Sequence, residues 1–192
     1  MQQNSNQPNI KAILSGDSQA FSKLVDDHKN LVYTVALRML KNTEEAEEVA
    51  QDTFVKVFKS LKNFKGDSKF STWIYRVAYN TCLDRLKSNK KEFLNKSIDD
   101  INGFEIADVG NALEGMVADE KIVLIRNCVE SLSSDDAALI TFFYFEEKNL
   151  KELSLILDLN ENTVKVRLFR ARARLATILK KRLTPVITEN YG

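Results

Sequence analysis

The sequence is poor in cysteine, histidine, glycine and proline. Its 192 residues include two Cys, one His, six Gly and two Pro. Two widely spaced cysteines, Cys82 and Cys128, with no CxxC pair and a single histidine provide neither a zinc site nor a disulfide framework, so we expect buried, reduced thiols and no metal or cofactor. The scarcity of Gly, of Pro and of alternating apolar residues predicts an all-α fold.

Long apolar runs are also missing. None approaches the roughly 20 residues of a membrane-spanning helix. Residues 1–9 are polar and rich in Gln and Asn, and they lack the basic start and apolar centre of a signal peptide. We therefore expect a disordered N-terminus over residues 1–9 and a cytoplasmic protein.

Charge of one sign is not in excess overall, but it is segregated along the chain. The net charge is +1. Residues 59–91 hold nine Lys or Arg and two acids, and residues 161–183 hold eight and one. Between these basic blocks, residues 93–120 hold seven acids and one Lys. This pattern predicts two basic bodies separated by an acidic linker, which we place at residues 91–119.

The first half of the chain has the apolar periodicity of four helices. They are predicted at residues 10–14, 18–40, 44–61 and 72–86, and form one domain over residues 10–90. His28 falls on an apolar helix face and is expected in the core, as are Phe54 and Phe58. A second, smaller domain over residues 120–183 begins with helices at 120–132 and 134–147, and residues 184–192 form a tail.

The last third of the chain is typical of a helix-turn-helix. Asn149 and Glu152 form a capping box that starts a short helix, and Asp158 ends it. Asn160 caps a second helix in which Val164, Leu168 and further apolar residues follow one face and cations project from the rest. A cationic second helix after a tight turn is the geometry of major-groove recognition. Basic amphipathic helices also bind membranes or acidic partners, but the short, capped first helix favours DNA.

The basic block at residues 59–91 interleaves cations with aromatic rings. Aromatic rings that stack on bases and cations that meet phosphates are the chemistry of single-stranded nucleic-acid binding. Because Tyr75 does not share a helix face with Trp73, not all of these rings can lie in one core. The alternative for Trp73 and Phe70 is an ordinary core position. The acidic start of the preceding helix, with Glu47 and Glu48, is either a solvated face or a docking surface for a partner.

Four stretches, in this order, resemble the sigma-70 family of bacterial RNA polymerase sigma factors, in its small two-domain extracytoplasmic-function (ECF) group. They are residues 20–25, 44–58, 64–80 and 162–172. The resemblance covers residues 10–183, and it implies two helical domains joined by a flexible linker. It leaves no room for the N-terminal inhibitory region or the middle domain of housekeeping sigma factors.

The resemblance implies a role for each stretch. Core RNA polymerase would be bound by Glu47, Glu48, Gln51, Asp52 and Phe54. The opened −10 promoter element would be bound by Asn63, Phe64, Lys65, Trp73, Tyr75, Arg76 and Asn80. The duplex −35 element would be bound by Thr163, Lys165, Val166, Arg167, Phe169, Arg170 and Arg174. An anti-sigma factor is the further partner that the family implies.

Three positions depart from the family pattern. One is Leu150, which replaces a common Ser or Thr, and Asn149 takes over the cap. Asp158 stands where many members have a turn glycine, and Asp tolerates the left-handed backbone conformation that such a turn needs. Val166 replaces a frequent Ser on the DNA-facing side, which removes a hydrogen bond to the −35 element.

Three functions were weighed. A promoter-specificity factor without catalysis fits best, because no phosphate-binding glycine loop and no set of nucleophile and base is legible. An ordinary helix-turn-helix regulator that binds duplex DNA without core polymerase is the alternative, and the basic aromatic block counts against it. An enzyme is the least supported.

Overall fold

The computed structural model describes residues 8–90 and 117–190, and within these ranges the chain is helical with no strand. The predicted all-α fold is confirmed. Most of the predicted linker and nearly all of the predicted disordered N-terminus lie outside the described residues. No helix in the described ranges is long and apolar enough to cross a membrane.

The N-terminal helices are α1 (Ile10–Leu14), α2 (Ser18–Leu40), α3 (Thr43–Ser60), the short 3₁₀ turn η1 (Leu61–Asn63) and α4 (Phe70–Lys90). Side-chain caps decide where the longer helices begin. Asp17 accepts hydrogen bonds from the backbone N–H groups of Gln19 and Ala20, and Asn42 accepts one from Glu45. Helix α4 starts two residues earlier than the predicted Thr72.

The C-terminal helices are α6 (Ala118–Glu130), α7 (Ser134–Ile140), the π-helical turn η2 (Thr141–Phe145), α8 (Leu150–Leu157) and α9 (Glu161–Asn190). Ser133 caps α7 by accepting a hydrogen bond from Asp136 N–H. The single helix predicted from residue 134 to 147 is wrong in its second half, where the backbone widens into η2. Helix α9 continues to Asn190, through residues that the sequence assigned to a C-terminal tail from residue 184.

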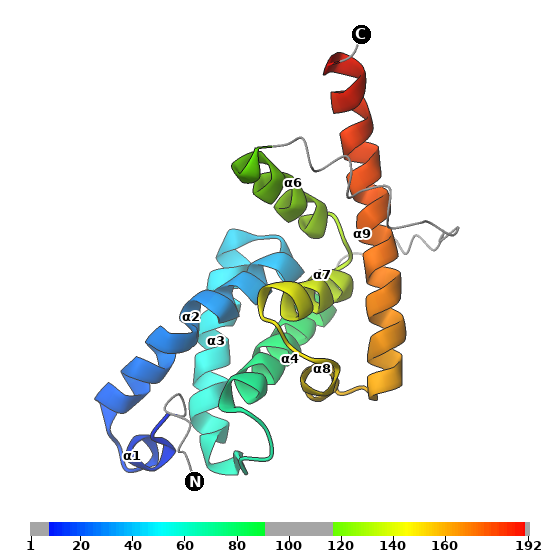
Figure 1. The fold of residues 1–192 in the computed structure, drawn as a ribbon. Coiled ribbons are helices and arrows are strands. Elements are labelled where there is room, and N and C mark those ends of the chain that lie inside the picture. The colour runs from blue at the N-terminus through cyan, green and yellow to red at the C-terminus, as the bar shows by residue number, and fades with distance from the viewer. Residues whose placement is uncertain (1–7, 91–116, 191–192) are drawn as a thin grey trace.

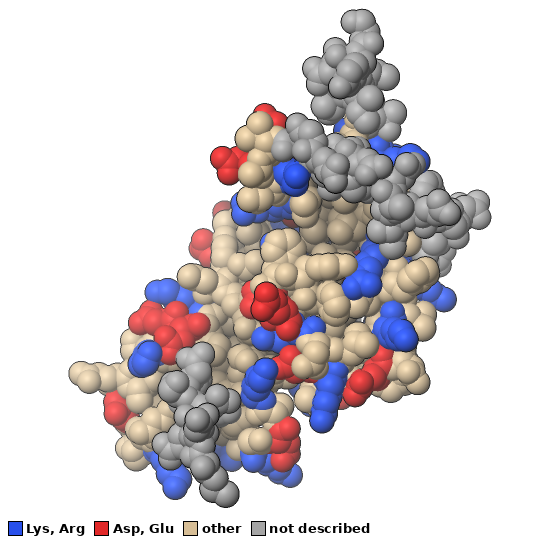
Figure 2. Space-filling view, in the orientation of Figure 1, with Lys and Arg blue, Asp and Glu red and all other residues tan. Residues whose placement is uncertain are grey.

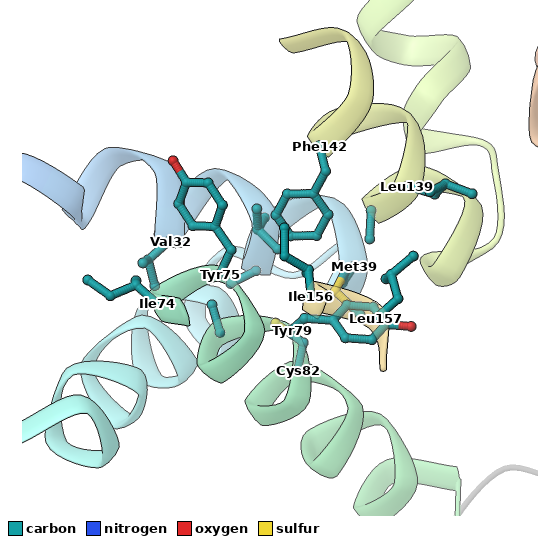
Figure 3. Close-up of a cluster of buried hydrophobic side chains, with 14 of the residues drawn as sticks. Val32, Met39, Ile74, Tyr75, Tyr79, Cys82, Leu139, Phe142, Ile156 and Leu157 are labelled. Atoms are coloured by element: carbon teal, nitrogen blue, oxygen red, sulfur yellow. The ribbon is translucent and has the colours of Figure 1, made fainter. Parts of the chain in front are cut away.

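The two groups of helices are packed on each other, with α8 beside α4 and α7 beside α2 (Figure 1). One cluster of buried side chains runs through both groups and includes Val32, Ile74, Phe142 and Ile156 (Figure 3). The sequence predicted two helical domains on a flexible linker and did not place them relative to one another. Burial of this apolar surface is the driving force that holds them together here.

Inward-facing residues were predicted well, with one exception. His28 is partly buried and its Nδ1 lies 2.9 Å from the Leu24 carbonyl oxygen, as expected for a core histidine. Cys82 and Cys128 are buried and unpaired, and burial raises the pKa of Cys82 to about 12. The core position predicted for Phe58 is wrong, because this residue is half-exposed. Its ring and that of Phe21 make an edge-to-face contact, with 5.1 Å between centroids.

Candidate nucleic-acid interfaces

The helix-turn-helix is built by local contacts that the sequence predicted. Asn149 Oδ1 accepts a hydrogen bond from Glu152 N–H at 2.9 Å, and Glu152 Oε2 accepts one from Asn149 N–H at 3.1 Å. Asp158 adopts the left-handed conformation at φ 56°, which ends α8. Asn160 then caps α9 by accepting from Thr163 N–H at 2.8 Å. The predicted capping box and turn are therefore confirmed in detail.

Most of the residues predicted to contact the −35 element lie on the exposed face of α9. Those with exposed side chains are Lys165, Val166, Arg167, Phe169 and Arg170, while Thr163 is partly buried. Phe169 exposes 66% of its surface, although a ring of this size is ordinarily buried. An exposed helix face that combines cations with apolar side chains can meet both phosphates and base edges in a major groove.

Arg174 does not share this exposed face. Its guanidinium lies 2.8 Å from Asp136 of α7, whose side chain is largely buried. Arg174 thus ties α9 to the body of its own helical group. The resemblance implied a DNA contact for Arg174, and no local pattern in the sequence indicated an ion pair with the distant Asp136.

A cation–aromatic cluster lies beside α9 and was not predicted from the sequence, which indicated only that cations project from this helix. The Arg172 guanidinium lies 4.9 Å from the Phe143 ring centroid and 5.3 Å from that of Tyr144. Next to it, an open groove of about 570 Å³ is lined by residues that include Phe143, Leu150, Lys165 and Phe169. The run of aromatic residues at 142–145 was the available signal.

The loop before α4 is organised around three rings in edge-to-face and tilted contact. Phe64, Phe70 and Trp73 lie between 5.1 and 5.4 Å apart by ring centroid. Phe70 is buried, whereas Phe64 and Trp73 are partly exposed, so the ring cluster both closes the core and reaches the surface. Gly66 has φ +80° in this loop, a conformation that favours glycine.

The remaining residues predicted for the −10 element divide between solvent and the C-terminal helices. Asn63, Lys65 and Asn80 are exposed. Tyr75 is only 6% exposed, because its ring stacks on that of Phe142 with 5.7 Å between the ring centroids. Arg76 Nη2 lies 3.0 Å from Asp158 of the helix-turn-helix.

Tyr75 corrects one step of the sequence argument. It lies on a different side of α4 from Trp73, and this seemed to exclude a core position for both. The C-terminal helices cover that second side, so Tyr75 is buried as well (Figure 3). Burial raises the pKa of Tyr75 above its usual value, and the adjacent Glu146, which accepts a hydrogen bond from the Tyr75 hydroxyl at 3.3 Å, adds to the rise.

The acidic side of α3 carries the residues predicted to meet core polymerase. Glu47, Glu48, Gln51 and Asp52 are exposed. Phe54 is 8% exposed and belongs to the core, so it offers little surface to a partner in this arrangement. Val55, about half-exposed, extends this surface and was not predicted. In the described ranges no group of His, Cys, Asp and Glu is placed to hold a metal ion.

Two sequence families match the two groups of helices. Residues 24–92 match the family described as Sigma-70 region 2, and residues 122–175 match Sigma-70, region 4. The ECF RNA polymerase sigma factor SigW of Bacillus subtilis is 32% identical over 177 residues, which cover 89% of this chain and 95% of SigW. The chain belongs to the sigma-70 family, in its ECF group. The resemblance inferred from four motifs is confirmed.

Other relatives agree with this membership. The RNA polymerase sigma-H factor of Pseudomonas aeruginosa is 28% identical over 193 residues, which cover 97% of this ECF chain and 98% of the relative. Among solved structures, CnrH in complex with the cytosolic domain of CnrY has a TM-score of 0.62 at 21% identity, with 90% and 95% of the two chains covered. RpoE of Bartonella quintana, in complex with the anti-sigma factor NepR, has a TM-score of 0.63 at 18% identity, with 84% and 98% covered. These two structures show that the fold is shared.

Proposed function

We propose that this sigma-70 family member is a promoter-specificity factor. It binds core RNA polymerase, recognises a −35 element as duplex and a −10 element as an opened strand, and promotes melting without catalysing a reaction itself. The observation that carries the proposal is the combination, in one chain, of an exposed cationic recognition helix, α9, with a basic aromatic loop and helix, residues 61–80. A duplex-only regulator has no use for the second feature.

Each helical group has a separate task in this proposal. Residues 10–90 hold the polymerase-binding face of α3 and the −10 site, and residues 120–183 hold the −35 site; residues 91–119 connect them. Lys165, Val166, Phe169 and Arg170 face bases, and Thr163 and Arg167 lie nearer phosphates. Binding at two sites on one promoter raises the effective concentration of the second site once the first is occupied.

Energy for melting comes from differential binding. A base that leaves the stack costs a few kcal/mol, and stacking on an aromatic ring returns about 1–3 kcal/mol per base. Asn63, Phe64 and Lys65, with Asn80, form the pocket for such a base, supported by Trp73. An anti-sigma factor is the proposed regulatory partner, and the cytoplasm, where core polymerase acts, is the proposed location.

Run-off transcription on genomic DNA fragments with purified core polymerase tests the proposal. The chain is expected to co-purify with core polymerase and to direct transcripts from a specific set of start sites. If it binds duplex DNA tightly, fails to associate with core polymerase and leaves transcription unchanged, it is an ordinary helix-turn-helix regulator instead.

A further inference from the structure

The side of α4 that faces the C-terminal helices is lined with hydrogen-bond donors, and each of them meets an acidic side chain. Arg76 lies 3.0 Å from Asp158, and Lys69, one residue before α4, lies 3.0 Å from Glu152. The hydroxyls of Tyr75 and Tyr79 donate to Glu146 and Asp135 at 3.3 and 3.2 Å, respectively. Four donors on one side of α4 are therefore matched by four carboxylates from η2, α7, α8 and their connections.

These carboxylates occupy donors that phosphate and base oxygens of a nucleic acid would need. Cationic groups and ring hydroxyls that bind a strand donate to phosphate and base acceptors, and a carboxylate offers the same negative acceptor. The C-terminal domain is strongly basic along α9, yet it turns acidic residues toward α4. Figure 2 shows opposite charges interleaved where α8 meets α4 and basic side chains along the α9 edge.

We propose that the C-terminal domain of the free chain acts as an internal competitor for the −10 strand, by holding Lys69, Tyr75, Arg76 and Tyr79 with four carboxylates that substitute for nucleic acid. The inference rests on the proposed −10 role of α4. It adds a regulatory contact that the promoter-specificity function alone does not require. Opened-strand DNA and the C-terminal domain then bind the same side of α4 in mutually exclusive ways.

An exposed ion pair lies in this interface. The Arg76 and Asp158 side chains are 44% and 79% exposed, and exposed ion pairs add little net stability in water. Water is excluded by the shared apolar cluster, in which the Tyr75 ring stacks on Phe142 with an interplanar angle of 25° (Figure 3). The apolar cluster therefore holds the docked state together, and the ionic contacts set its register and occupy the donors of α4.

The same closed state also engages part of α9. A cavity of about 240 Å³ at the junction is lined by Tyr79, Asp135, Arg167 and Arg170, among others. Two of the cations proposed for the −35 element thus line the same cavity as the carboxylate that holds Tyr79.

The test compares two triple variants of the full-length chain. The first, Asp135→Asn with Glu146→Gln and Asp158→Asn, neutralises interface carboxylates without changing side-chain size, and Asn tolerates the left-handed conformation at 158. The control, Asp26→Asn with Asp27→Asn and Asp84→Asn, removes the same three charges from exposed ion pairs within the N-terminal domain, with Lys29, Lys23 and Lys56. Circular dichroism checks that both variants are folded.

Binding of fluorescein-labelled oligo(dT), in the absence of core polymerase, is measured by anisotropy, and the radius of gyration by small-angle scattering. If the closed state holds about nine-tenths of the molecules, its loss raises the apparent affinity roughly tenfold. The interface variant is expected to show this gain and a larger radius of gyration, beyond any gain in the control. Equal affinities for the two variants, or an interface variant as compact and as weakly binding as wild type, would overturn the inference.

The outcome is separable from that of the proposed function. Suppose that the wild-type chain directs run-off transcription and that the two triple variants bind oligo(dT) equally. The internal-competitor inference is then wrong, and the promoter-specificity function still holds. If the wild-type chain does not direct transcription, the proposed function is wrong. The anisotropy comparison still decides whether the C-terminal domain blocks α4.

Discussion

Individual side chains on α9 differ in how far sequence position predicted their surroundings. Lys165 and Arg170 lie on the exposed face, as the helical period and the resemblance predicted. Arg174, one turn beyond Arg170, is instead bound to Asp136 of α7. The sequence separates these two residues by 38 positions, and no local pattern reveals such a pair. Helical spacing gives the face of a residue, and only tertiary packing decides which charges that face meets.

Arg170→Ala tests the recognition face. If the guanidinium contacts a base edge, its removal is expected to cost about 1–3 kcal/mol of promoter binding. Run-off transcription from the cognate promoter with saturating core polymerase measures the loss. Lys181→Ala, on an exposed position of the same helix, serves as the control and should have a small effect. Equal transcript yield from Arg170→Ala and wild type would exclude Arg170 from base recognition.

Asn80→Ala tests the opened-strand site. Asn80 is exposed and lies on α4 after the aromatic cluster, so its amide is free to hydrogen-bond a base edge. The variant is expected to bind the upstream duplex normally and to melt the −10 region less. Permanganate reactivity of −10 thymines measures melting, and Ser88→Ala on the same helix is the control. Normal permanganate reactivity in Asn80→Ala would assign the base pocket to other residues.

Whole elements were more predictable than their ends. The start of α8, the turn at Asp158 and the start of α9 were all predicted, because each depends on hydrogen bonds between residues at most four apart in sequence. The π-helical turn η2 was not. Its widened backbone contains the aromatic run at 142–145, in which Phe142 is buried between the two helical groups, and propensity rules do not contain that constraint.

Asn149→Ala tests the capping box at the start of α8. Loss of the cap leaves backbone N–H groups of the first turn unpaired and is expected to cost about 1 kcal/mol, or about 2–4 °C in Tm. Differential scanning calorimetry measures the change. Asn30→Ala, an exposed position inside α2, is the matched control and should not lower Tm, because Ala favours a helix interior. A Tm loss as large in the control would mean that the cap is not the cause.

The interface between the two helical groups contains two carboxylates, Glu152 and Glu146, whose pKa values are shifted in opposite directions. Burial alone would raise the pKa of Glu152, but hydrogen bonds from Lys69 and from Asn149 N–H outweigh it and lower the pKa below 4.5. Burial raises the pKa of Glu146 above 4.5, against the hydrogen bond from Tyr75. Ionised Glu152 therefore stabilises the fold above its unfolded-state pKa, and this contribution is lost as pH falls. Ionised Glu146 costs stability, and this cost develops as pH rises.

Two variants separate these effects. Glu152→Gln keeps an acceptor for the cap. Wild type should have the higher Tm at about pH 7, and the difference in Tm should shrink as pH falls to about 3. For Glu146→Gln the sign is opposite: the Tm of the variant should rise relative to that of wild type as pH rises over the same range. Thermal melts followed by circular dichroism measure both. Parallel Tm profiles for wild type and Glu152→Gln would show that Glu152 is not coupled to folding.

The sequence by itself determined the helices, their caps, the helix-turn-helix and membership of the sigma-70 family. These depend on short-range hydrogen bonds, on apolar periodicity and on motifs whose order along the chain is specific. Only the tertiary structure decided that the two helical groups share a core, that Tyr75 is buried against Phe142, and that four carboxylates meet the donors of α4. Each of these joins residues more than 50 positions apart, and their contact depends on how two separate apolar surfaces fit together, which no local pattern encodes.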